Sequence, residues 1–319
     1  MNVRQAQYLI AVCEEGSVSG AARRLRVSQP ALSQTIQAAE REIGMKIFNR
    51  SANLPFLTYA GEKYLAAARR LLALEVNLER EMMELQNSPE GKLRIGISTL
   101  RAMFLLPKIL PRFMEEFPGV ELELLESGTS DLDESVLEGK VDLAFLLSAE
   151  PTYPDLVYIT LCRERMLLIA GAETELAKTR EPYTGVQIQE ARNERFISLR
   201  RGHGVRTLQD RMFYENRIAP KILFETGSPE AARRLALVCG AVTLFPETLL
   251  NTASFDAVAP GVWFPVLGSH YLRDFFLCFH RGSYLSRYMQ RFISLTRDVF
   301  LDLPTGPVVP SGGEPQIIP

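Results

Sequence analysis

The stretch "SQPALSQTIQAAEREIG", residues 28–44, decides how the first part of this chain folds. Ser28 is a preferred N-cap residue and a proline at position 30 is tolerated in a first turn, so the stretch is predicted to form a helix. Its apolar residues recur at three- and four-residue spacings and line one side of that helix. They are Leu32, Ile36, Ala39 and Ile43. The other side carries Pro30, Ser33, Gln34, Gln37 and Arg41. A solvated helix usually carries Lys and Glu there, so this polar side indicates contact with another molecule.

A shorter helix is predicted directly before this one. Residues 3–15 form a first helix, Gly16 ends it, and Ser17 can cap the next. That next helix has apolar residues at i, i+3, i+4 and i+7. They are Val18, Ala21, Ala22 and Leu25. Two short helices joined by a tight turn, the second with a polar face, form a helix-turn-helix, although other helical hairpins share this pattern.

The residues after the second helix strengthen this interpretation. Two short apolar runs, 47–48 and 56–57, flank a turn at 51–53 and predict a small β-hairpin, called the wing below. Thr58 then caps a long helix over about 59–86, which carries a sustained apolar stripe. The stripe comprises Tyr64, Leu65, Leu71, Leu72, Leu74, Leu78, Met82 and Leu85. A helix of this length with such a stripe usually pairs with a partner helix.

Strand and helix patterns alternate after the breaker cluster "NSPEG", residues 87–91. The predicted strands are "LRIGIS", "VELELLE" and "VDLAFLL", and then, after a middle section, "RFISL", "KILFET" and "AVTLF". Alternation of this kind indicates βαβ units and a largely parallel sheet, and its two sets indicate two lobes. Late strands "VWFPV" and "FFLCFH" precede a closing helix over 284–300. The remaining residues lack periodicity, so a disordered tail is expected.

Composition narrows the class of protein. The net charge is -2, yet residues 1–70 hold ten Lys/Arg against five Asp/Glu, which confines any polyanion contact to this end. No secretory signal and no membrane-spanning segment is found, so a cytoplasmic protein without membrane contact is expected. The four cysteines are expected to be buried small apolar side chains, with redox sensing as the minor alternative. The cysteines and histidines show no metal-ligand spacing.

Residues 1–60 resemble the winged helix-turn-helix of LysR-type transcriptional regulators. The matching residues are Ala21, Ala22, Leu25, Ser28 to Ala31, Ser33, Ile36, Glu40, Gly44, Phe48, Arg50, Leu57, Thr58, Ala60 and Gly61. The resemblance continues through the long helix and "KLRIGIS", then more loosely to about residue 300. Two residues depart from the family pattern. Ala39 replaces a large aliphatic residue, and Asn53 replaces an arginine that would contact phosphate from the wing.

The resemblance implies an α/β protein with four parts. They are a winged helix-turn-helix domain at 1–58, a linker and dimerisation helix at 59–87, an effector-binding domain at 92–302, and a disordered tail at 303–319. The effector domain is expected to resemble a periplasmic binding protein, with lobe I at about 92–163 and 266–302 and lobe II at about 164–265. The resemblance further implies a homodimer through the linker helix, a homotetramer, double-stranded DNA and a small effector as partners, and RNA polymerase as a further candidate. No cofactor is expected.

Residue chemistry assigns candidate DNA contacts. Ser hydroxyls and Gln amides can both donate and accept hydrogen bonds, as base edges require, so Gln34 is the leading candidate for base readout. Phosphate contact is predicted for cations flanking the helix and for residues at its start. The full candidate set is Arg23, Arg24, Ser28, Gln29, Pro30, Ser33, Gln34, Gln37, Arg41, Lys46, Arg50 and Asn53. The alternative is that Ser28 only caps the helix and that Arg23 and Arg24 are solvated.

Candidate effector contacts follow from the ends of the predicted strands, where two-lobed α/β domains bind ligands. The resemblance implies that Ser98 and Thr99 hold a ligand carboxylate through a hydroxyl and a backbone N–H. Positional candidates are Thr129, His203, Arg206, Thr226 and Phe245. The arginines around "RGHG" favour a small anionic effector, although an ordinary turn with solvated arginines explains them equally well.

Three functions are compared. A ligand-responsive transcription factor accounts for the basic first segment and for the two-lobed domain. The alternative is a cytoplasmic small-molecule binding protein without sequence-specific DNA activity, which the first segment argues against. An enzyme is not expected, because the sequence shows no nucleophile–base motif, no metal cluster and no phosphate-binding loop.

Overall fold

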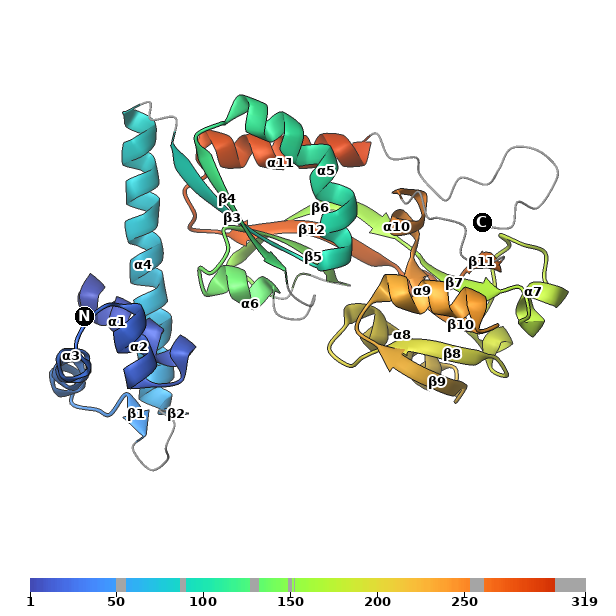
Figure 1. Ribbon diagram of the computed structural model, residues 1–319, viewed down its shortest axis with the longest axis horizontal. Coiled ribbons are helices and arrows are strands. Elements are labelled where there is room, and N and C mark those ends of the chain that lie inside the picture. The colour runs from blue at the N-terminus through green and yellow to red at the C-terminus, as the bar shows by residue number, and fades with distance from the viewer. Residues whose placement is uncertain are drawn as a thin grey trace. The chain divides into compact units, whose positions relative to one another are not determined.

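A computed structural model describes residues 1–49, 56–86, 90–126, 132–148, 151, 153–252 and 261–301 (Figure 1). The chain divides into two compact units. Unit 1 comprises residues 1–91 together with 282–286, and unit 2 comprises 92–281 and the residues from 287 onward. Within the described residues, no helix has the length and apolar content to cross a membrane.

Unit 1 begins with three short helices, each of which starts at a capped residue. The Oδ1 of Asn2 and the hydroxyls of Ser17 and Ser28 accept hydrogen bonds from backbone N–H groups of the first turns. The helices are α1 (Val3–Glu15), α2 (Val18–Arg24) and α3 (Gln29–Ile43). Leu9, Val12, Ala21 and Leu32 form their common core. The short helices predicted from caps and spacing are therefore present, because their apolar sides fit together.

The wing and the long helix follow. Strand β1 (Phe48–Asn49) pairs antiparallel with β2 (Phe56–Leu57), and the turn predicted between them lies outside the described residues. Helix α4 (Tyr59–Leu85) starts at Thr58, whose hydroxyl accepts from the backbone N–H of Gly61. Its first half packs into the unit 1 core, whereas its second half leaves several apolar side chains exposed. These are Leu74, Leu78, Met82, Met83 and Leu85.

Unit 2 contains two five-stranded sheets, each the centre of one lobe. Their orders are β4-β3-β5-β12-β6 in lobe I and β11-β7-β10-β8-β9 in lobe II. The lobe I strands are β3 (Gly91–Ile97), β4 (Val120–Glu126), β5 (Leu143–Ser148), β6 (Leu156–Glu164) and β12 (Arg273–His280). The lobe II strands are β7 (Met166–Gly171), β8 (Arg195–Leu199), β9 (Lys221–Thr226), β10 (Val242–Pro246) and β11 (Gly261–Pro265).

The prediction of a largely parallel sheet is only partly correct. The βαβ units do pair in parallel, as in β3–β5, β8–β9 and β8–β10. However, β12 runs antiparallel to β5 and β6, and β7 runs antiparallel to β10 and β11. Both sheets are mixed because the chain passes between the lobes twice, after β6 and after β11. The first strand after each passage, β7 or β12, joins its sheet in the reverse direction.

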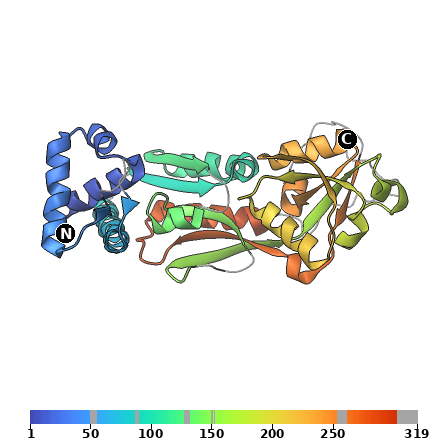
Figure 2. The same cartoon turned by 90° about the horizontal axis from the view of Figure 1, so that it is seen from below.

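Helices cover both faces of each sheet (Figure 1; Figure 2). In lobe I, α5 and α11 lie on one face and α6 on the other. In lobe II, Phe196 packs with residues of α8 and the next residue, Ile197, packs with residues of α9. These helices are α5 (Thr99–Glu116), α6 (Leu132–Leu137), α8 (Gly204–Glu215), α9 (Pro229–Val238) and α11 (Arg287–Leu301). Four further short helices among the described residues were not predicted: α7 (Glu175–Thr179), α10 (Glu247–Thr252) and two 3₁₀ turns (Ile188–Ala191 and Ser269–Tyr271).

The closing helix α11 starts three residues later than the sequence pattern indicates. The preceding residues 282–286 belong to unit 1, where they bind α4. Asn77 donates from its amide to the carbonyl of Gly282 over 2.9 Å and accepts from the backbone N–H of Tyr284 over 3.1 Å. The Tyr284 hydroxyl donates to Glu84. These contacts hold the segment out of the helix, and no local sequence signal could reveal them.

Candidate DNA-binding and effector-binding sites

The outer face of α3 is accessible over its whole length. Leu32, Ile36 and Ala39 are buried against unit 1, which turns the opposite side chains outward. Gln29, Pro30, Gln34, Gln37 and Arg41 are exposed, and Ser33 is half-buried. The Gln37 amide donates to the Ser33 hydroxyl over 3.4 Å. The Gln34 amide makes no hydrogen bond with the described residues and is available to a ligand. The face presents amides, a hydroxyl and one cation in a row.

Ser28 lies at the start of this face and has a structural role. Its hydroxyl accepts from the backbone N–H of Ala31 over 3.4 Å, which caps α3. It is nevertheless exposed, so the hydroxyl is accessible to a ligand of the helix start.

The cationic side chains among the DNA-binding candidates differ in whether they are already paired with a carboxylate. The side chains of Arg23 and Arg41 make no hydrogen bond or ion pair with the described part of the chain and are exposed. Arg24 contacts Glu14 over 2.5 Å, and this hydrogen bond raises the pKa of the Arg24 guanidinium. Lys46 contacts Glu40 over 2.7 Å. Arg50 and Asn53 lie outside the described residues.

Glu40 holds α3 to the wing, a role that the sequence did not reveal. Its carboxylate is 5% exposed and accepts from the Lys46 ammonium and from the backbone N–H groups of Ile47 and Phe48. Burial by itself would raise the pKa of Glu40, but these three donors outweigh burial and hold the pKa below its ordinary value. Thr58 adds a hydroxyl bond to the carbonyl of Lys46 over 2.6 Å. The buried carboxylate of Glu40 and the hydroxyl of Thr58 therefore both hold the start of the wing.

The first turn of α5 in lobe I has the features of an anion site. Ser98 occupies the N-cap position, but its hydroxyl does not bond to the first turn of the helix. Ser98 is half-buried and Thr99 is exposed. A helix start has up to four backbone N–H groups without helical partners and a partial positive charge, both of which favour a carboxylate. Thr129, the next candidate in lobe I, lies outside the described residues.

The lobe II candidates separate into accessible and structural residues. His203 is half-buried at the start of α8, where its side chain does not cap the helix, and Thr226 is partly exposed at the end of β9. Arg206 is 8% exposed and donates to Asp210 over 2.7 Å, to Glu225 over 2.5 Å and to the carbonyl of Leu199 over 2.8 Å. The guanidinium of Arg206 therefore joins α8 to β9 and is already paired.

Phe245 is also structural. It is fully buried in a cluster with Trp263 of β11, Leu249 of α10 and Leu100 of α5. Its side chain therefore contributes to the junction of the lobes and does not line an open site.

A buried polar cluster at this junction was missing from the candidates. Arg101, the third residue of α5, donates to the Thr248 hydroxyl of α10 over 2.8 Å and to Glu164 at the end of β6. Its guanidinium lies 4.1 Å from the ring centroid of Phe275. Arg101 and Glu164 are 7% and 1% exposed, respectively. The sequence signal was weak: a single arginine shortly after the predicted strand "LRIGIS".

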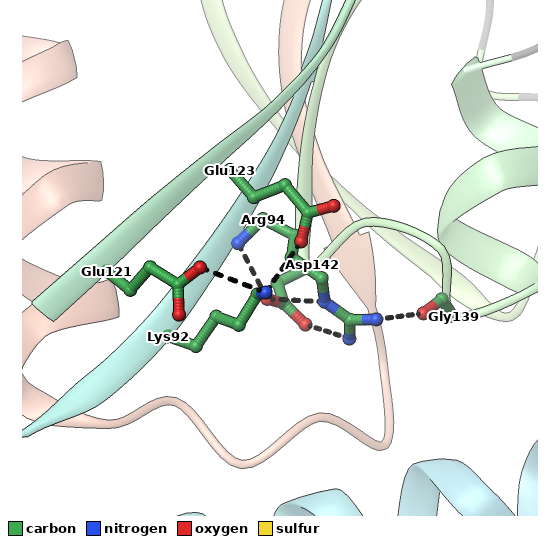
Figure 3. Close-up of polar contacts among 6 residues, drawn as sticks. All are labelled: Lys92, Arg94, Glu121, Glu123, Gly139 and Asp142. Carbon is green, nitrogen blue, oxygen red and sulfur yellow. Dashed lines mark hydrogen bonds and ion pairs between the residues drawn. The ribbon is translucent and has the colours of Figure 1, made fainter. Parts of the chain in front are cut away.

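A second charged cluster lies at the outer edge of lobe I (Figure 3). Arg94 contacts the buried carboxylate of Asp142 over 2.8 Å and donates to the carbonyl of Gly139 over 2.7 Å. Lys92 lies between Glu121 and Glu123, at 3.3 and 2.9 Å. Since these cations are paired within the cluster, it connects β3 to β4 and β5 and offers no free charge to a ligand.

The cysteines only partly follow the expectation of burial. Cys278 is buried, Cys13 and Cys162 are half-buried, and Cys239 is exposed, so the expectation was wrong for Cys239. It lies at the end of α9, where the helix meets solvent. Burial raises the pKa of Cys162 and of Cys278 to about 12, which keeps both thiols protonated. The described residues contain no cluster of His, Cys, Asp or Glu suited to a metal ion.

A helix-turn-helix unit joined to a two-lobed α/β unit defines a class of ligand-responsive DNA-binding proteins, and comparisons with known proteins agree. Residues 3–62 match the model "Bacterial regulatory helix-turn-helix protein, lysR family", and residues 86–301 match "LysR substrate binding domain". The chain is 28% identical over 311 residues to the uncharacterized HTH-type transcriptional regulator YcgK of Bacillus subtilis, covering 93% of this chain and 94% of that protein. It is 32% identical over 254 residues to the HTH-type transcriptional regulator ClcR of Pseudomonas putida, covering 78% and 84%.

Solved structures agree on the fold. The crystal structure of full-length CbnR complexed with its target DNA is similar at a TM-score of 0.57 and 22% identity, covering 93% of this chain and 99% of that one. The chain belongs to the LysR family of transcriptional regulators. The predicted family and fold class are confirmed. A small-molecule binding protein without sequence-specific DNA activity is not favoured, because residues 3–62 match the DNA-binding model.

Proposed function

We propose that this regulator reads promoter DNA through the outer face of α3 and responds to a small anionic effector bound between its lobes. The observation that carries the proposal is the exposed row of Ser33, Gln34, Gln37 and Arg41 on a helix whose apolar side is buried. Its width and chemistry suit the major groove, where amide and guanidinium groups pair with base edges.

Phosphate contact is assigned first to Arg23, whose side chain has no partner among the described residues. Arg24 and Lys46 contribute less, because each shares its charge with a glutamate. Each phosphate contact adds about 0.9 to the slope of log affinity against log salt. Ser28, Gln29 and Pro30 at the helix start remain candidates, as do Arg50 and Asn53.

The effector is proposed to place a carboxylate at the start of α5, held by the Ser98 hydroxyl, by Thr99 and by free backbone N–H groups. His203 and Thr226 of lobe II are proposed to contact its other end. Arg206 and Phe245 are left out of direct contact, since one is paired and the other lies in the core. Binding acts as a population shift, which requires unequal affinity for two arrangements of the lobes.

We also propose that residues 1–58 form the DNA-binding domain, 59–87 the linker helix, 92–302 the effector-binding domain and 303–319 a tail. The exposed apolar residues of α4 support a homodimer through this helix, and family membership supports a homotetramer with RNA polymerase as a further contact. A cytoplasmic location follows from the proposed DNA target, and no cofactor or catalytic role is proposed.

A gel shift tests the function. DNA from upstream of the protein's own gene is compared with random competitor DNA, at low and at raised salt. The proposal expects one fragment to bind better than competitor and the preference to persist as salt rises. Equal binding of all fragments would overturn it.

A further inference from the structure

We infer that Arg101, Glu164 and Thr248 are positioning residues that hold the effector-binding turn of α5 against lobe II. They are called the clasp below. The inference rests on the proposed effector site, because its functional meaning comes from Ser98 and Thr99 lying in that turn.

The clasp is a closed ring of hydrogen bonds between elements of both lobes. One Arg101 nitrogen donates to the hydroxyl of Thr248, and another donates to one oxygen of Glu164. The Thr248 hydroxyl donates to the second oxygen of Glu164. Arg101 and Glu164 belong to lobe I and Thr248 to lobe II, so the carboxylate has one donor from each lobe.

Burial makes the clasp sensitive to movement of the lobes. The Glu164 side chain is fully buried, and a buried carboxylate that loses a donor without gaining water is strongly disfavoured. Leu100 and Phe104 of α5 pack beside it into the lobe II cluster around Trp263. A displacement of α10 from α5 therefore breaks a hydrogen bond and exposes apolar surface together.

The clasp and the proposed effector site share one helical turn. Ser98 is the N-cap of α5 and Arg101 is its third residue. The backbone N–H of Arg101 is among the groups that a helix start leaves free, whereas its side chain reaches lobe II. An effector that binds this turn therefore acts on the same residue that fixes the spacing of the lobes.

A neighbouring ion pair differs in a useful way. Arg165 contacts Glu247 over 2.7 Å and joins the crossover after β6 to α10. Its guanidinium is 43% exposed, so water can replace the contact if it breaks. In the clasp, by contrast, the Glu164 side chain is fully buried and that of Arg101 is 8% exposed, while Thr248 is half-buried, so a hydrogen bond lost at the carboxylate is less readily replaced by water.

The test compares Thr248→Val, which keeps the shape but removes the hydroxyl, with Thr248→Ser, which keeps the hydroxyl. Trp263 is the single tryptophan of the chain and lies at this junction, 4% exposed. In the full-length protein, Thr248→Val should move Trp263 emission to longer wavelength, increase its quenching by acrylamide, and make amides 98–106 exchange about tenfold faster. Thr248→Ser should behave as the wild type.

Thr207→Val is the matched control, because Thr207 is an exposed residue of α8 away from the junction. Circular dichroism verifies that each variant is folded. The inference is overturned if Thr248→Val matches the wild type in both measurements, or if Thr248→Ser changes as much as Thr248→Val. A gel shift on the same proteins tests the proposed function separately. If the wild type shows no preference for any DNA fragment over competitor, the proposed function is contradicted. The fluorescence and exchange results still test the clasp in that case.

Discussion

At the scale of single residues, Gln34 is the sharpest test of DNA readout. Gln34→Ala should weaken binding to the specific fragment by about 1–3 kcal/mol and leave binding to random DNA nearly unchanged, because an amide read by a base edge carries sequence information. Gel shifts on both DNAs measure the difference. Gln7→Ala, at an exposed position of α1, is the matched control. Equal losses on both DNAs would reassign Gln34 to the phosphate backbone.

Glu40 makes a prediction about pH. Its pKa is held below the ordinary value in the folded protein, so its stabilising effect is present above about pH 4.5 and is lost as pH falls through the folded pKa. Glu40→Gln should make α3 amides exchange about tenfold faster at pH 7, corresponding to ~1.4 kcal/mol.

The gap between wild type and Glu40→Gln should then close below the folded pKa of Glu40, where the wild-type carboxyl is protonated as well. Hydrogen exchange of both proteins at matched pH values measures this. A gap that is equally large at both ends of the pH range would show that the carboxylate charge is not what holds the wing.

Cysteine reactivity depends on the environment of each thiol. Cys239 is exposed, whereas burial raises the pKa of Cys162 and of Cys278 to about 12. Since thiolate is the reactive form, Cys239 should react first with a thiol reagent at pH 8, Cys162 should react much more slowly, and Cys278 should react only on unfolding. Mass spectrometry of labelled peptides identifies the site, and Cys239→Ser should remove the fast phase. Rapid labelling of Cys278 would contradict its burial.

At the scale of elements, α4 is predicted to pair with a second copy of itself. Leu74 and Leu78 are 66% and 56% exposed, and Met82 and Leu85 continue the stripe. Burying one leucine contributes about 1.5–3 kcal/mol, so Leu78→Glu should reduce the assembled mass in light scattering after size exclusion. Ala66→Glu adds the same charge at an exposed position outside the stripe and should leave the mass unchanged. An unchanged mass for Leu78→Glu would place the dimer contact elsewhere.

The sheets show how an element can be predicted while its direction cannot. The strand patterns of β3, β5, β8 and β10 were readable because their apolar runs are buried on both faces. The reversed direction of β7 and β12 follows from passage of the chain between lobes, which is a property of the whole unit.

At the scale of the whole molecule, effector binding should increase the free energy of unfolding by mass action, by about 2.7 kcal/mol at a hundredfold excess over Kd, and so raise the melting temperature. A thermal-shift screen of small carboxylates identifies the ligand. Thr99→Val should then abolish this stabilisation and keep DNA binding. Thr179→Val, at an exposed threonine of α7, is the control. An unchanged shift in Thr99→Val would remove Thr99 from the site.

The sequence by itself determined the helix-turn-helix, the long helix and the two sets of βαβ units. The reason is that caps and apolar spacings are local. Residues such as Ser28, Leu32 and Ile36 therefore indicate both that a helix forms and which of its sides is buried. It also placed the polar row on α3, because a helix that buries one side must expose the other.

Only the tertiary structure decided which charged side chains are free. Arg23 and Arg24 are neighbours in sequence, yet only Arg24 contacts a glutamate, and Arg206 of α8 is paired with Glu225 of β9. The clasp likewise joins residues 101, 164 and 248. Ion pairs and buried hydrogen bonds depend on distances of a few ångströms between segments far apart in the chain. No local spacing encodes those distances, because they arise only when the lobes pack.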